Sequence, residues 1–124
     1  MSEPTKEQKK EFWEGLGFKF TPHLSSGGRP YDRTELMEYP DGNKILVNKG
    51  ESLEIDQNSL FRYAVPNRIS EIAFMYAANC VSCDIEDLEG DFFEGHIDVN
   101  SIEEAWEKSA LALFWAIRKV FLKK

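Results

Sequence analysis

The chain has 124 residues, of which 42% are apolar and 30% are charged, and it carries a net charge of −7 with a pI near 4.9. This length suits one globular domain, and this balance of apolar and charged residues argues against a disordered chain. The negative charge repels phosphate backbones, so we expect no nucleic-acid partner. These bounds predict a single soluble domain over residues 1–124.

The chain opens with a predicted helix over residues 6–16. Thr5 and Gln8 have the spacing of a capping box, in which each residue bonds a free amide of the first turn. Gly17 follows the last apolar residue of this segment and is a natural stop for a helix. No signal peptide, transit sequence or lipid-attachment motif is visible here, so we expect the protein to be cytoplasmic.

A strand and a loop are expected next. Residues 18–21 alternate between apolar and polar side chains, which predicts a strand that ends at Pro22. Residues 24–30 are rich in Ser and Gly and predict a flexible loop. The glycine pair does not fit the phosphate-binding pattern Gly-x-x-x-x-Gly-Lys-Ser/Thr, so an anion site is not favoured there.

The middle of the chain predicts a β-hairpin followed by a short helix. Residues 34–39 and 44–48 flank a Pro-Asp-Gly-Asn tetrapeptide, which is typical of a tight turn between paired strands. Residues 49–55 form a connection. A short helix is then expected over residues 59–65, capped by Asp56 or Asn58 and stopped by Pro66.

Residues 69–83 are ambiguous between a strand and a helix. Large and small apolar residues alternate here, which favours a strand buried on both faces, although helical steps fit some of the same positions. Residues 84–91 predict an acidic turn that includes Gly90. Residues 92–99 then predict a final strand that leads directly into the last helix.

The last segment, residues 101–122, predicts the longest helix of the chain. Ser101 and Glu104 again have the spacing of a capping box. The helix has a continuous apolar stripe, whose members are Ile102, Trp106, Ala110, Leu113, Ile117 and Phe121. We expect it to lie buried against a sheet; docking to a partner or to a membrane surface is the alternative. The uncharged run at residues 110–117 is too short to cross a bilayer, so no membrane role is expected.

Taken together, these elements predict the α+β class. The expected architecture is a mainly antiparallel sheet of four or five strands, packed by the N-terminal and C-terminal helices as an α/β sandwich. The wide apolar helix could also be shared across a two-fold interface, so a homodimer remains open.

Cys80 and Cys83 have the two-residue spacing of zinc and redox motifs. His96 follows, but the positions at which a zinc finger needs its second His hold other residues. On a strand the two thiols would point to opposite faces and could not share an ion. We therefore expect structural thiols, which the reducing cytoplasm would keep unlinked.

The remaining polar clusters do not form a recognisable catalytic pattern. The expected acidic turn has five carboxylates, which are Asp84, Glu86, Asp87, Glu89 and Asp91. Their spacing does not match a calcium-binding loop, so a solvated turn is favoured. His23 and His96 have no Ser or Cys at a known motif spacing. We therefore assign no catalytic, cofactor-binding or metal residue, and an enzyme is not the favoured prediction.

Three apolar stretches resemble one group of known proteins when they are taken in order. They are residues 11–17, 59–66 and 110–117. In this order and spacing they resemble small phage or prophage proteins of the alpha-beta-alpha (ABA) sandwich type, a group without an established biochemical role. The resemblance implies a packing arrangement, and it carries no site residue to this chain.

The favoured functional hypothesis is a small intracellular accessory protein, phage-derived, that acts by protein–protein contact with a partner that the sequence does not identify. One form of this hypothesis has residues 24–31 and the acidic turn contacting a basic partner. The alternative is a metal-binding module or a metal-assisted hydrolase that uses His96, Cys80, Cys83 or nearby carboxylates. No cofactor is expected under the favoured hypothesis.

Overall fold

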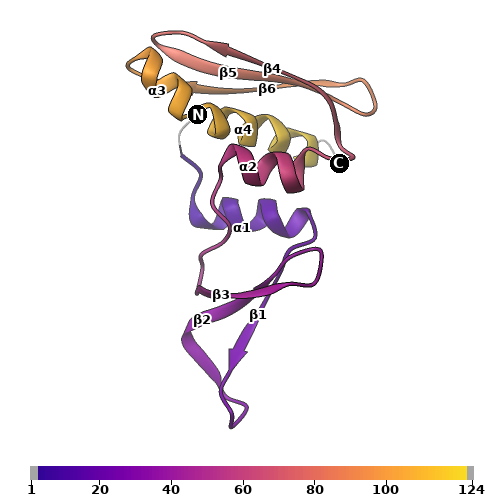
Figure 1. Cartoon of the computed structure of the whole chain (residues 1–124), viewed down its shortest axis with the longest axis vertical. Helices are drawn as coiled ribbons and strands as arrows, with labels where there is room; N and C mark the ends of the chain where they lie inside the picture. Colours follow the sequence, from indigo (N-terminus) through magenta and orange to yellow (C-terminus); the bar gives the residue numbers. More distant parts are fainter. Residues whose placement is uncertain (1–2, 123–124) are drawn as a thin grey trace. The chain divides into compact units, whose positions relative to one another are not determined.

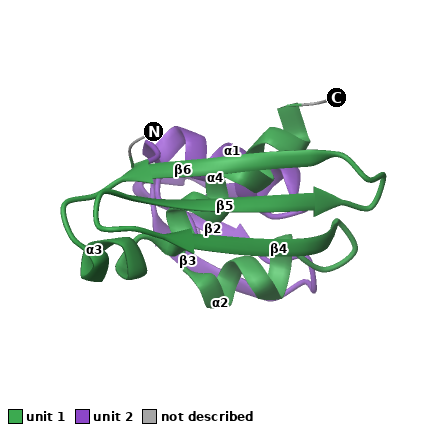
Figure 2. Ribbon diagram, turned by 90° about the horizontal axis from the view of Figure 1, so that it is seen from above, with its two compact units in different colours: residues 1–3, 54–124 green, residues 4–53 purple. Residues whose placement is uncertain are grey.

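A computed structural model of the chain, described here for residues 3–122, has the predicted α+β class (Figure 1). Residues 4–53, purple in Figure 2, form one compact unit, and residues 54–122, green in Figure 2, belong to the other. We call them the first and the second unit in chain order; the key of Figure 2 numbers them in the opposite order. Each unit contains a three-stranded antiparallel sheet and one of the two terminal helical segments. The prediction of one sheet with four or five strands is therefore wrong, because the first three strands pair only among themselves.

The first unit contains one helix and three strands in sheet order β1-β2-β3. They are α1 (Lys6–Gly15), β1 (Lys19–Leu24), β2 (Pro30–Glu38) and β3 (Lys44–Asn48). The capping box at Thr5 and Gln8 is confirmed, since each side chain bonds the backbone N–H of the other residue. The hairpin between β2 and β3 is also confirmed.

The strand β1 continues past Pro22, where the sequence predicted its end. Pro22 pairs with Glu35 of β2, and the register shifts between Pro22 and Leu24. Proline is tolerated there because β1 is an edge strand and the ladder is already irregular at this point. The predicted loop over residues 24–30 is correspondingly shorter, and β2 begins at Pro30.

Aromatic rings fill the interior of the first unit. Trp13 is completely buried, and its indole N–H donates to the carbonyl of Leu53 at 2.8 Å. The Trp13 ring lies 5.1 Å from the ring of Phe18, which in turn contacts the ring of Tyr39 edge-on. Gly17 lies between α1 and Phe18, and its φ of 100° is the left-handed conformation that ends the helix.

The second unit begins with a short helical segment. Its elements are α2 (Gln57–Ser59), the π-helical turn η1 (Leu60–Ala64), β4 (Ile69–Tyr76), β5 (Cys80–Asp87), β6 (Phe92–Asp98), α3 (Ile102–Glu107) and α4 (Ser109–Leu122). Asp56 is the N-cap, as one of the two predicted candidates, and its carboxylate accepts from the N–H of Ser59 at 2.7 Å. The strands follow the order β4-β5-β6.

Residues 69–83 form strands, as favoured, but they belong to two strands rather than one. A tight turn, closed by the hydrogen bond from the N–H of Ala77 to the carbonyl of Cys80, separates β4 from β5. Burial on both faces is wrong, because Ala73 and Met75 are exposed. The acidic turn predicted over residues 84–91 is shorter than expected: β5 continues to Asp87, and the turn with Gly90 occupies residues 88–91.

The predicted C-terminal helix is present but is interrupted at Lys108. This residue ends α3 with a φ of −97° and a ψ of 10°, which are not helical values. The interruption changes the direction of the apolar stripe, so Ile102 and Trp106 are exposed, contrary to the prediction, while Leu113 and Ile117 are buried. No helix within residues 3–122 has both the length and the apolar character needed to cross a bilayer.

The core of the second unit lies between α4 and one face of its sheet. The inward side chains of β5 are Val81, Cys83 and Ile85, all of them fully or almost fully buried. The backbones of α4 and β6 approach so closely that a Cβ at Gly95 would lie 1.8 Å from the carbonyl oxygen of Ala112. Only a glycine on the strand and small residues on the helix permit this contact.

We predict that Gly95→Ala destabilises the chain by about 3 kcal/mol or more. The added methyl group would overlap backbone atoms of α4, which cannot rotate away as a side chain could. Urea unfolding measures the change. Gly27→Ala is the matched control, because its Cβ would meet only the Ser25 side chain at 3.9 Å. A loss below about 1 kcal/mol at Gly95 contradicts the packing described here.

Candidate functional site

The outer face of the β4-β5-β6 sheet is the candidate functional site. Because side chains alternate along a strand, the buried residues of β5 leave Ser82, Asp84 and Glu86 on the opposite side. No element of the second unit covers this side (Figure 2). We call this surface the acidic face, and its members are Glu71, Ala73, Met75, Ser82, Asp84, Glu86, Phe92, Glu94, His96 and Asp98.

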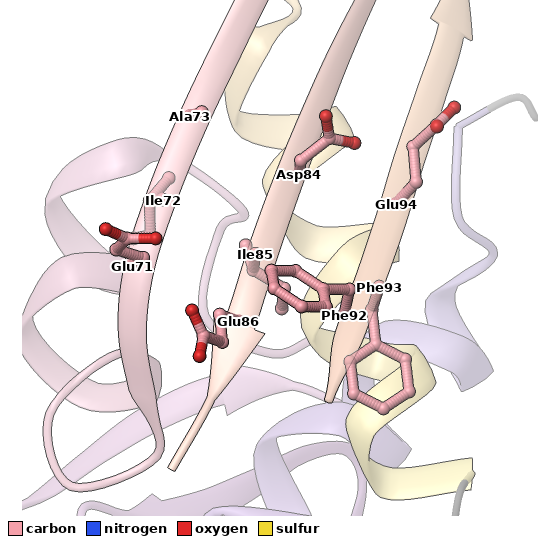
Figure 3. Close-up of a pocket in the computed structure, with 9 residues that line it drawn as sticks. All are labelled: Glu71, Ile72, Ala73, Asp84, Ile85, Glu86, Phe92, Phe93 and Glu94. Atoms are coloured by element: carbon pink, nitrogen blue, oxygen red, sulfur yellow. The ribbon is translucent and has the colours of Figure 1, made fainter. Parts of the chain in front are cut away.

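The strand register places like charges directly opposite each other on the acidic face. Glu71 is the partner of Glu86, and Asp84 is the partner of Glu94. Figure 3 shows these four carboxylates on three neighbouring strands. They line a depression whose volume is about 590 Å³. Like charges at directly opposite positions destabilise a sheet, so packing within the chain does not explain this arrangement.

The acidic and basic residues are distributed unequally between the two units of the chain. Residues 4–53 contain eight basic and eight acidic residues, whereas residues 54–124 contain seven basic and 13 acidic residues. No Lys or Arg occurs between Arg68 and Lys108, a segment that contains 11 carboxylates and all three strands of the second sheet. This gap in the basic residues is the sequence feature that could have indicated the acidic face.

Two large apolar side chains accompany the carboxylates. Phe92 is 74% exposed and Met75 is 65% exposed, at the two opposite edge strands of the sheet. His96 bonds Asp98 at 3.0 Å on the same face. The face therefore combines negative charge with two exposed apolar side chains, one on each edge strand of the sheet.

The structure separates the residues of the zinc hypothesis. Cys80 and His96 lie on the outer face, whereas Cys83 faces α4 and is completely buried. The prediction that the two thiols point to opposite faces is confirmed, so these three residues cannot hold one ion together. Burial, with a smaller effect of the neighbouring Asp84 charge, raises the pKa of the Cys83 thiol to about 12.

The other polar residues considered in the sequence form hydrogen bonds or ring contacts within the fold. Asp87, Glu89 and Asp91 place carboxylate oxygens within 4.8 Å of one another at the end of β5. The Asp87 carboxylate accepts from the N–H groups of Glu89 and Asp91, both at 2.9 Å, and so stabilises the turn. His23 lies in the first unit, where it stacks on Tyr31 and bonds the Thr34 hydroxyl.

Comparisons with known protein families, with curated proteins and with solved structures find no match to this chain. The resemblance to phage proteins of the ABA sandwich type therefore stays a prediction. The function has to be argued from the geometry of the second sheet.

We predict that the Cys83 thiol makes stability depend on pH in alkaline solution. The folded chain holds this proton more tightly than the unfolded chain, whose thiol has a pKa of 9.0. The contribution is therefore constant below about pH 9 and is lost as pH rises from 9 towards 12, with a slope approaching ~1.4 kcal/mol per pH unit. Urea unfolding at several pH values should give a flatter curve for Cys83→Ala, and equal slopes contradict the assignment.

We also predict that Glu94→Gln stabilises the chain by about 0.2–1 kcal/mol, because it removes the repulsion with Asp84 across the ladder. The gain should shrink when salt is added, since both side chains are exposed and screened. Thermal or urea unfolding at two salt concentrations measures it. Glu54→Gln, at an exposed position outside the sheet, is the control and should change little. No gain at low salt contradicts the proposed repulsion.

Proposed function

We propose that this chain is a small interaction protein whose acidic face binds a basic segment of another protein. The observation that carries the proposal is the strand register, which places Glu71 opposite Glu86 and Asp84 opposite Glu94 on the outer face of the sheet. A cationic partner would convert this repulsion into attraction on binding. The phage origin and the cytoplasmic location suggested by the sequence are part of the same proposal.

The chemistry of the face favours a protein segment over the other candidate ligands. A nucleic acid would be repelled by carboxylates on all three strands. Phe92, which lies beside the carboxylates in Figure 3, offers apolar contact that a protein segment can use and a free metal ion cannot. The metal-assisted hydrolase has less support, because Cys83 is separated from Cys80 and His96 by the sheet.

The proposal predicts salt-dependent binding of a peptide of alternating Lys and Gly residues, measured by calorimetry. The double variant Asp84→Asn/Glu94→Gln should weaken binding by about two- to thirtyfold, since each exposed charge contact contributes ~0.2–1 kcal/mol. The double variant Glu54→Gln/Glu103→Gln is the matched control, because it removes the same charge from outside the sheet. Equal weakening by both variants, or no binding by the parent protein, contradicts the proposal.

A further inference from the structure

The two edges of the second sheet differ in whether their backbone groups are occupied. In an antiparallel ladder, residues alternate between pairs that exchange hydrogen bonds and pairs whose N–H and C=O groups point away. The hydrogen bond from the N–H of Ala77 to the carbonyl of Cys80 shows that Ala77 belongs to a hydrogen-bonded pair at the end of the ladder between β4 and β5. Counting back from Ala77, every second residue of β4 belongs to the other kind of pair. The backbone groups of Ile72, Phe74 and Tyr76 therefore point to the free edge, where no hydrogen-bond partner is found among residues 3–122.

The edge at β6 is partly occupied. The hydrogen bond from the N–H of Val99 to the carbonyl of Asn79 shows which residues of β6 pair through hydrogen bonds with β5. Glu94 is not one of them, so its backbone N–H and C=O point to the free edge. The Lys119 ammonium of α4 donates to this carbonyl of Glu94. A lysine that occupies an edge carbonyl is a common obstacle to the addition of another strand. Within the described part of the chain, the β4 edge has no such bond and is thus the more open of the two.

A groove lies beside the open edge, on the side of the sheet opposite the acidic face. It has a volume of about 510 Å³ and is lined by residues of β4, α3, the start of α4 and the segment that leads into α2. The rings of Phe74, Tyr76 and Trp106 form a continuous row, with centroids 6.0 and 5.5 Å apart. Trp106 is 69% exposed, although it belongs to the apolar stripe that the sequence predicted to be buried.

The helices show where an added strand would lie. In Figure 2, α2 and α3 extend past β4 at the margin of the sheet. A fourth strand beside β4 would therefore run above the aromatic groove. Its side chains would alternate between the two sides of the sheet, with one set on the acidic face beside Glu71 and the other set in the groove.

We propose that the basic partner binds as an extended strand paired with β4, in which basic and apolar residues alternate. This inference rests on the proposed function and adds the mode of binding and the sequence pattern of the partner. Strand addition supplies affinity through backbone hydrogen bonds to Ile72, Phe74 and Tyr76, and specificity through the side chains on each side. The basic set would neutralise the acidic face, and the apolar set would cover Trp106 and Tyr76.

A second copy of the chain fits this edge less well. Two β4 strands paired with each other would place Glu71 of each copy on one continuous outer face, next to the carboxylates already there. This arrangement would join two acidic faces into one surface and would add to its negative charge instead of neutralising it. Charge complementarity therefore favours a basic partner over self-association.

The test compares a peptide of alternating Lys and Val with a peptide of the same composition in which all the Lys residues precede all the Val residues. We expect the alternating peptide to bind at least about fivefold more tightly. Hydrogen exchange should show that it protects the amides of Phe74 and Tyr76, which exchange rapidly in the free chain.

Trp106→Ala should weaken the binding of the alternating peptide by about fivefold or more, as expected for an exposed aromatic anchor. Leu88→Ala, at another exposed apolar residue, is the control.

The outcomes separate this inference from the proposed function. If both peptides bind equally and both depend on Asp84 and Glu94, strand addition is overturned while the acidic face stands as a binding surface. If neither peptide binds, both proposals fail. If the amides of Phe74 and Tyr76 become protected with rising protein concentration in the absence of peptide, the occupant is a second copy and the inference is overturned.

Discussion

The close contact between β6 and α4 is the constraint on which the second unit depends. At Gly95 the strand meets the helix backbone with no room for a side chain, and Ala112 and Ala116 are the small residues on the facing helix. This contact, together with the burial of Leu113 and Ile117, determines which side of the sheet is the inner one. Because side chains alternate along each strand, the same contact determines the outer side as well. The acidic face is therefore a consequence of how α4 packs.

The charges follow this division between the two sides. A sheet covered by a helix on one side only has an outer side that must be polar enough to remain dissolved. A mixture of Lys and Glu would satisfy that requirement and would also form favourable pairs across the strands. The chain instead has no Lys or Arg between Arg68 and Lys108. Solubility alone does not explain this choice, whereas the basic partner proposed above would.

Local patterns in the sequence predicted local structure well. The caps at Thr5, Asp56 and Ser101 are all present, because a cap depends on residues only three positions apart. The pairing of strands depends on distant residues, and no local pattern showed that β1, β2 and β3 form a sheet separate from that of β4, β5 and β6.

The interruption at Lys108 was missed because Lys is compatible with a helix and the apolar period continues on both sides of it. The acidic face was missed for the same reason as the sheets, since its carboxylates come from three strands whose register the sequence does not reveal.

The two edge strands of the second sheet, β4 and β6, differ in how far their outward backbone groups are occupied. An exposed edge strand is a liability unless something occupies or blocks it, and at β6 the Lys119 side chain partly serves that purpose.

At β4 the irregular register near Ile69 and the charge of Glu71 limit pairing at one end, but Phe74 and Tyr76 at the other end have no such protection. The unprotected end is also the end beside Trp106, whose ring contacts Tyr76 but is largely exposed to water. An open backbone edge, an aromatic row that is exposed at Trp106 and a repulsive acidic face are three separate costs to the free protein. One extended basic strand beside β4 would relieve all three at once, which is why we favour that mode of binding over contact with the acidic face alone.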